Sequence, residues 1–285
     1  MDIKKLAELL VESSEIYSQA RCIPWWQINQ KTADEFVEYN CFPPKIVKEV
    51  NTCVAECGKE ELLSPVGQGG FTLFHLLVWH NFYDAVEGML RNEIIGKEAI
   101  DLTDHSGQGV TPFLLACAQG NLIMVKLLLE YGANVSFCDK RGRNAFHFLA
   151  YPDLDILEKN LDCLEQSVDQ RGELARLLTC DINLKNEEGL TPLEYLLSHE
   201  YNAEYTWPLT EIFLEKGAKT DYVDEDGNTL LMLASRQGHI TAALQLMKNC
   251  PELLEVENKA GMHRIRHAVE YPNMAMYFAL LEHGA

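Results

Sequence analysis

Residues 109–135 read GVTPFLLACAQGNLIMVKLLLEYGANV, and this stretch decides the fold. Thr111 can accept a hydrogen bond as the N-cap of a helix, and the proline that follows it suits the first helical turn. Apolar residues continue at helical spacing until Gly120 interrupts them. Asn121 can cap a second helix, which Gly132 can end in a left-handed conformation. The stretch therefore predicts two short helices joined by a tight turn.

The block that opens this stretch recurs along the chain. Its copies start at Gly70 (GFTLFH), Gly109 (GVTPFL), Gly142 (GRNAFH), Gly189 (GLTPLE), Gly227 (GNTLLM) and Gly261 (GMHRIR). The spacings between them are 39, 33, 47, 38 and 34 residues. A period near 33 residues with such a block is typical of a helical repeat array. Asp139, Asn186, Asp224 and Asn258 each stand three residues before a block glycine, where an Asx side chain can set a tight turn.

Residues 109–135 and the later stretch 227–250, GNTLLMLASRQGHITAALQLMKNC, resemble ankyrin repeats. The resemblance covers about residues 67–285 in six divergent units, which start near 67, 106, 139, 186, 224 and 258. It implies an all-α solenoid of stacked antiparallel helix pairs, with short β-hairpin loops along one edge. It also implies reversible binding of another protein, as in eukaryotic scaffold proteins and in effectors that intracellular bacteria deliver into host cells.

Residues 1–66 are expected to form a helical N-terminal cap over the first repeat, because terminal repeats need a polar cover. Within this region, residues 43–66 are either part of the cap or a decayed seventh repeat. The third unit carries an insert near 152–172 that has the pattern of an added or extended helix. Smaller inserts are expected near 91–102 and 201–208, and insertions in repeat proteins often lie on functional faces.

The composition excludes several classes of function. The formal net charge is −19, which opposes binding to nucleic acid or to anionic lipid. No run of about 18 apolar residues predicts a membrane span. Nine cysteines without a Cys-x-x-Cys pair predict reduced thiols rather than a disulfide framework. We therefore expect a monomeric cytoplasmic protein, which as a secreted bacterial effector would act in the host cytosol.

No catalytic residue, cofactor or metal is expected. His75 and His147 occupy the block's His position, where the resemblance implies hydrogen bonds to the block's Thr and to neighbouring backbone. The pairs Cys53–Cys57 and His263–His267 each have helical spacing, but they lie five repeats apart and cannot together provide the four ligands that zinc prefers. The Gly-rich stretch 67–70 lacks the Lys-Ser/Thr of a phosphate-binding loop and is interpreted as a hairpin turn.

By resemblance, a partner would contact the hairpin tips and the exposed side of each first helix, which form a concave face. The candidate contact residues are Phe71, Trp79, His80, Lys140, Arg141, Arg143, Tyr151, Glu187, Glu188, Glu225, Asp226 and Arg236. Aromatic and Arg side chains are common energetic anchors of interfaces, so Phe71, Trp79 and Arg143 are expected to matter most.

Charge along this face predicts the kind of partner. Residues 186–226 hold 11 acidic and 2 basic residues, so the fourth and fifth units are strongly acidic. Such a field favours a partner with a basic or mixed-charge segment.

Two other hypotheses about the function of the chain remain open. The chain could be the interaction part of an enzyme whose catalytic site lies in the N-terminal region, in the third-unit insert or beyond residue 285. Alternatively, the array could self-assemble through Tyr277, Phe278 and Leu281.

Overall fold

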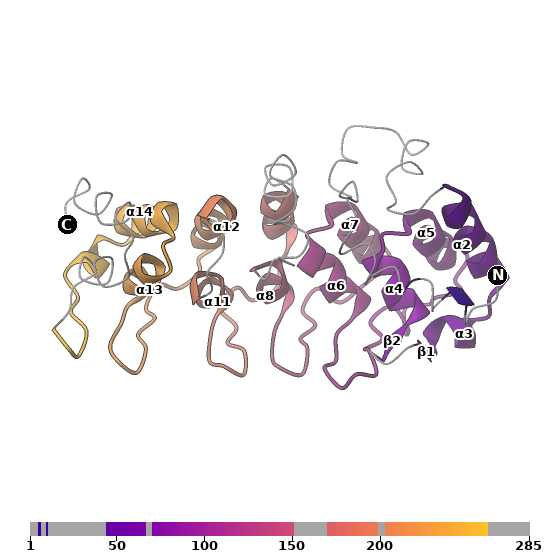
Figure 1. Cartoon of the computed structure of the whole chain (residues 1–285), viewed down its shortest axis with the longest axis horizontal. Coiled ribbons are helices and arrows are strands. Elements are labelled where there is room, and N and C mark those ends of the chain that lie inside the picture. The colour runs from indigo at the N-terminus through magenta and orange to yellow at the C-terminus, as the bar shows by residue number, and fades with distance from the viewer. Residues whose placement is uncertain are drawn as a thin grey trace. The chain divides into compact units, whose positions relative to one another are not determined.

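A computed structural model describes residues 5–6, 10, 44–66, 70–150, 170–198 and 203–261. Tyr151, most of the expected insert at 152–172 and the His263–His267 pair lie outside these residues. The chain divides into two compact units, Met1–Cys180 and Asp181–Ala285, and short helices make up most of each (Figure 1). The expected boundary between a cap and the repeats at residue 66 stays a prediction.

The Met1–Cys180 unit is a row of helix pairs. Its helices with described bounds are α2 (Pro44–Glu56), α3 (Lys59–Leu63), α4 (Leu73–Trp79), α5 (Tyr83–Arg91), α6 (Pro112–Gln119), α7 (Leu122–Glu130) and α8 (Ala145–Ala150). Residues 170–177 are also helical. Strands β1 (Pro65–Val66) and β2 (Phe71–Thr72) form a small antiparallel hairpin. Helix α6 packs between α4 and α8, and α2 packs on α5.

The Asp181–Ala285 unit repeats the same plan. It contains α11 (Pro192–Ser198), α12 (Ala203–Glu215), α13 (Leu230–Arg236), α14 (Ile240–Asn249) and the 3₁₀ helix η3 (Pro251–Leu254). Helix α13 packs against α11 and α14, and α14 also packs against α12. Residues 203–208, which the sequence placed in an insert, belong to α12. The extra residues of this repeat therefore lengthen its second helix.

The caps predicted for residues 109–135 are confirmed. Thr111 Oγ1 accepts a hydrogen bond from the backbone N–H of Leu114, at 3.3 Å. Asn121 Oδ1 accepts one from the N–H of Met124, at 3.0 Å. Gly120 ends α6 in the left-handed region with φ +67°, which a residue without Cβ adopts at little cost. These local interactions set where both helices of the pair begin and where the first one ends.

The core lies between the two helices of each repeat and between neighbouring repeats. The residue two places after each repeat's capping position is fully buried and apolar: Phe74, Phe113, Phe146, Leu193 and Leu231. Burial of one such side chain stabilises the folded state by about 1.5–3 kcal/mol. The same sequence position thus supplies the core in every described repeat, and the hairpins are left for other roles. Among the described residues, no helix is both long and apolar enough to cross a membrane.

Candidate functional site

The hairpins at residues 139–143, 186–190 and 224–228 are each built around one Asx side chain. Asp139 Oδ1 accepts hydrogen bonds from the N–H groups of Arg141 and Arg143, at 3.0 and 2.8 Å. Asn186 and Asp224 make the same pair of bonds in their own hairpins, at 2.7–3.0 Å. The turns predicted at these positions are therefore confirmed. A carboxylate or amide that bonds two backbone donors fixes the loop without help from a partner.

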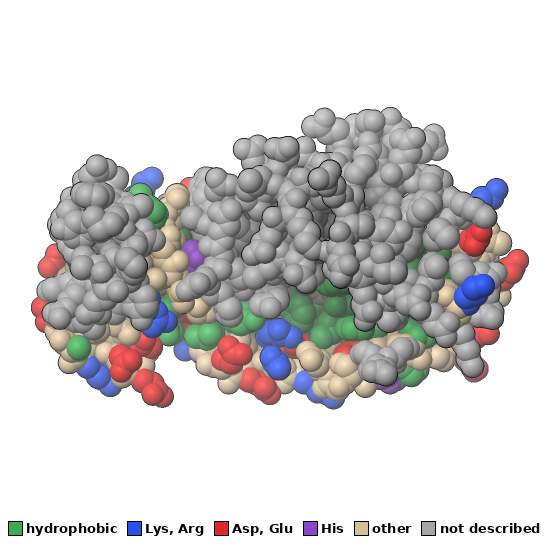
Figure 2. All heavy atoms as spheres, viewed as in Figure 1, with side chains coloured by type: hydrophobic (Ala, Val, Ile, Leu, Met, Phe, Trp, Pro, Cys, Tyr) green, Lys and Arg blue, Asp and Glu red, His purple; other side chains and the backbone are tan. Residues whose placement is uncertain are grey.

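Two exposed residues follow each of these Asx residues, and we call them the hairpin pair. The hairpin pairs are Lys140–Arg141, Glu187–Glu188 and Glu225–Asp226, and Asn258, whose Oδ1 accepts from the N–H of Ala260, precedes a fourth pair, Lys259–Ala260. Six of the predicted contact residues belong to them, and all six are exposed. In Figure 2, charged side chains line the edge where Figure 1 draws the hairpin loops. The hairpin pairs thus display side chains that their own loops do not need.

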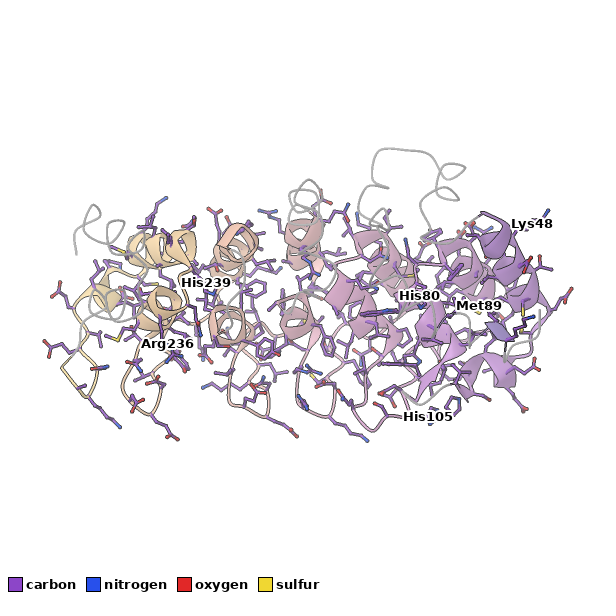
Figure 3. All side chains as sticks on the ribbon, viewed as in Figure 1. Lys48, His80, Met89, His105, Arg236 and His239 are labelled. Atoms are coloured by element: carbon purple, nitrogen blue, oxygen red, sulfur yellow. The ribbon has the colours of Figure 1, made fainter. Side chains whose placement is uncertain are left out.

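Neighbouring hairpins are joined through their backbones. The N–H of His105 donates to the carbonyl of Gly70 at 2.7 Å, and the N–H of Lys140 donates to that of Gln108 at 2.8 Å. In the second unit the N–H of Lys259 donates to the carbonyl of Asp226 at 2.9 Å. Figure 3 shows His105 among the hairpin loops. Within each unit, these hydrogen bonds make successive loops one continuous surface.

Arg143 has a different role from the one expected. Its guanidinium forms a salt bridge with Asp139 at 2.7 Å, and its side chain is only 16% exposed. The same group lies 4.6 Å from the centre of the Phe148 ring, a distance typical of a cation–π contact. The expectation of an exposed anchor is corrected here, because Arg143 is held inside its own repeat.

The other predicted contacts on the first helices are partly covered. Phe71, Trp79 and Arg236 are half-buried. His80 is also half-buried, and burial lowers the pKa of its imidazole to about 4, although a hydrogen bond with the Leu10 backbone opposes the shift. Figure 3 shows His80 among the helices, so its predicted place on an exposed face is corrected to a covered one.

The block histidines are structural, as the sequence predicted. His75 Nδ1 accepts a hydrogen bond from the N–H of Thr72 at 3.3 Å and lies 2.7 Å from Thr72 Oγ1. Its Nε2 lies 3.1 Å from the carbonyl oxygen of Val110 in the next hairpin, which places the proton on Nε2. Burial lowers the pKa of His75 to about 4, so the ring is neutral at pH 7. In the third repeat, Asn144 replaces the Thr, and its Oδ1 accepts from the N–H groups of Phe146 and His147.

Three of the described cysteines, Cys57, Cys117 and Cys180, lack the lowered pKa of an activated nucleophile. Burial raises the pKa of Cys57 to about 12 and that of Cys180 to about 11, and it also raises the pKa of Cys117. A raised pKa disfavours the thiolate, which is the reactive form. Within the described ranges, no three His, Cys, Asp or Glu side chains gather in a way that could hold a metal ion.

Polar side chains that tie one repeat to the next were missed by sequence reasoning. Arg171 is 3% exposed, and its guanidinium donates to the carbonyl of Ala118 at 2.6 Å and to that of Leu149 at 3.0 Å. Gln119 Nε2 donates to the carbonyl of Trp79 at 2.6 Å, and Gln237 does the same to Ser198 at 2.8 Å. These acceptors lie at the C-terminal ends of first helices, where carbonyls lack helical partners.

Several curated proteins are similar to parts of the chain. The phosphocholine transferase AnkX of Legionella pneumophila is 29% identical over 161 residues, which are 56% of this chain and 15% of AnkX. The B-cell lymphoma 3 protein homolog of Mus musculus is 26% identical over 220 residues, 77% of this chain and 38% of that protein. The probable palmitoyltransferase AKR2 of Saccharomyces uvarum is 32% identical over 78 residues, 27% of this chain and 11% of that protein. The chain thus spans well under half of each of these relatives.

The family comparison agrees with the geometry of the repeats. The model for ankyrin repeats matches residues 74–166 and 159–259, which together cover more than half of the chain. This range includes the Thr-capped first helices, the block histidines and the Asx-centred hairpins described above. The chain belongs to the ankyrin repeat family.

Proposed function

We propose that this chain binds a partner protein through the exposed hairpin pairs of its repeats, together with the half-buried Phe71 and Trp79 of the Met1–Cys180 unit. Ankyrin repeats support a protein–protein interaction module. The observation that carries the proposal is the exposure of the hairpin pairs, whose side chains take part in none of the ion pairs found among the described residues. Loops whose backbones are already fixed by hydrogen bonds bind with little loss of backbone entropy.

The proposed setting is a host cell, in which the chain acts as a bacterial effector and as a monomer in the cytosol. Its similarity to AnkX of Legionella pneumophila supports this part of the proposal. The net charge of −19 disfavours nucleic acid and anionic membranes as the target.

The repeats themselves are proposed to be non-catalytic. A second candidate is the interaction part of a larger enzyme, because two relatives carry enzyme names. These are the phosphocholine transferase AnkX and the probable palmitoyltransferase AKR2, and this chain matches only 15% and 11% of their lengths. In either case, the role of this chain is to hold another protein.

Site-specific photo-crosslinking tests the proposed face. A benzoylphenylalanine residue replaces Arg141, Glu188 or Glu225 on the hairpins, or Lys126 or Lys248 on second helices. All five positions are exposed, so each tolerates the substitution. Each variant is irradiated in a eukaryotic cell lysate, and the adducts are identified by mass spectrometry.

We expect the same partner in adducts from the hairpin positions and little of it from Lys126 or Lys248. Circular dichroism of each variant confirms that the fold is retained. Adducts that form only at the second-helix positions would move the binding surface away from the hairpins. A partner that crosslinks equally at all five positions would show contact without a defined face.

A further inference from the structure

We infer that the hairpin loops of the Met1–Cys180 unit bind an extended acidic segment of a partner protein. This inference rests on the proposed function and adds the chemistry of the bound segment. The surface concerned consists of Phe71, His105, Gln108, Lys140 and Arg141, and we call it the hairpin edge. The exposed charge of the hairpin edge differs in sign from that of the acidic repeats that follow. The prediction of a partner with a basic or mixed-charge segment was based on those acidic repeats.

The hairpin edge is continuous because its loops are bonded to one another. Gly70, next to Phe71, accepts a hydrogen bond from the N–H of His105, and Gln108 accepts one from the N–H of Lys140. A Cβ placed on Gly109 would lie 3.1 Å from Lys140 Cγ, so the stem of Lys140 runs over the preceding loop. The cationic end of Lys140 is therefore held near this edge.

The exposed charge of the hairpin edge is positive, although the whole chain carries −19. Lys140 and Arg141 are exposed, whereas the loop carboxylates Asp104 and Asp139 are buried. Asp104 accepts hydrogen bonds from its own loop, and Asp139 is paired with Arg143. Exposed charges are screened over about 8 Å at physiological salt, so a carboxylate bound at this edge responds mainly to the cations that it lies beside.

The size of the edge sets the spacing within the bound segment. Each of the three loops leads directly into α4, α6 or α8, and these helices pack side by side. The spacing of the loops is therefore set by the spacing of the helices. Packed helices lie about 8–10 Å apart, so Phe71 and the Lys140–Arg141 pair are separated by about 20 Å. An extended chain covers this distance in about six residues. The bound segment thus places an apolar side chain on Phe71 and an acidic pair about six residues away.

Fluorescence anisotropy on the full chain tests this inference. The probe is a short dye-labelled Gly/Ser peptide with one Phe about six residues from a Glu-Glu pair. A second probe replaces Glu-Glu by Lys-Lys, and a third places Phe directly beside Glu-Glu. The test variant is Lys140→Glu/Arg141→Glu. The matched control is Lys97→Glu/Lys126→Glu, which changes the net charge equally at exposed residues outside the hairpin edge.

We expect the acidic probe to bind the parent and the control alike, and to bind the test variant at least about tenfold more weakly. We also expect Phe71→Ala to weaken binding, and both altered probes to bind worse than the first. The inference is overturned if the test variant binds the acidic probe as tightly as the parent, or if the Lys-Lys probe binds equally well. Crosslinking at Glu188 and Glu225 does not depend on this edge, so the proposed function can survive that result.

Discussion

At the scale of single residues, the block histidine joins two repeats only when it is neutral. His75 uses Nδ1 as an acceptor within its own helix cap and Nε2 as a donor to Val110 in the next hairpin. A second proton would have to enter Nδ1 and would face the N–H of Thr72. Burial adds to this cost, which is why the pKa of His75 is lowered to about 4.

The lowered pKa predicts that stability falls with acidity. The folded-state pKa of about 4 for His75 and His80 lies below the ordinary 6.5, so the unfolded chain binds more protons as the pH decreases. Stability is therefore lost from about pH 6.5 down to about pH 4. Between pH 7 and pH 5 we expect a loss of about 2 kcal/mol per histidine in the free energy of unfolding.

Urea unfolding of the parent at both pH values checks this loss. His75→Asn should show a smaller loss than the parent. Equal losses for the parent and His75→Asn would contradict the role assigned to His75.

Removal of the buried Arg171 side chain is expected to lower the free energy of unfolding strongly. Arg171→Ala leaves the carbonyls of Ala118 and Leu149 without their donor, and each hydrogen bond from a charged group contributes about 1.5–3 kcal/mol. We expect the free energy of unfolding to fall by about 3 kcal/mol or more. Glu173→Ala, at an exposed position of the same helical stretch, is the control and should cost much less. Urea titration compares the two, and similar losses would argue against the bridging role.

At the scale of elements, alanine substitutions at two glycines that follow helices distinguish the cost of backbone strain from the cost of steric crowding. Gly120 has φ +67°, and a Cβ there would lie 2.5 Å from Arg171 Cγ. Gly132 has φ +95°, and a Cβ there would meet nothing within 4 Å. An alanine in the left-handed region costs about 1–2 kcal/mol. We expect this cost for Gly132→Ala and a clearly larger one for Gly120→Ala, as measured by denaturant unfolding. Equal costs would mean that Arg171 moves aside freely.

The elements could be predicted from sequence where their determinants are local. Thr111, Asn121 and the Asx residues act within four residues of their own positions, so the caps and turns of these repeats were predicted correctly. The Asp139–Arg143 pair is equally local, and the equivalent Asp224–Asn228 contact at 2.8 Å shows that this spacing is a usable signal. Arg143 was nevertheless assigned to the surface, because residue type was given more weight than spacing.

The contacts between repeats could not be predicted in this way. Arg171 reaches Ala118 across 53 positions, and Gln119 reaches Trp79 across 40. Neither pairing follows from periodicity, because an inserted segment changes the offset between repeats. His80 forms a hydrogen bond with the backbone of Leu10, which lies in a region without the repeat pattern. The exposure of the candidate contact residues was therefore predicted correctly at the loops and poorly at the ends of the first helices, and their contact with a partner stays a prediction.

At the scale of the whole molecule, the net charge of −19 predicts a dependence on salt. Repulsion among acidic groups destabilises a compact chain, and added salt screens it. We expect the melting temperature to rise between low and moderate NaCl. The variant Glu187→Gln/Glu188→Gln/Glu225→Gln/Asp226→Asn removes four exposed charges and should gain less from salt. A melting temperature that falls with added NaCl would show that attractive pairs outweigh the repulsion.

In each of these hairpins one side chain fixes the loop and other side chains are exposed, and this separation has a consequence for evolution. Asp139, Asn186 and Asp224 hold the loop backbone, and the side chains of the two residues after each of them take no part in these hydrogen bonds. Mutations at those two positions can change what is recognised while the repeat stays folded. Lineages that share this scaffold can therefore diverge quickly in target by substitutions at a few loop positions.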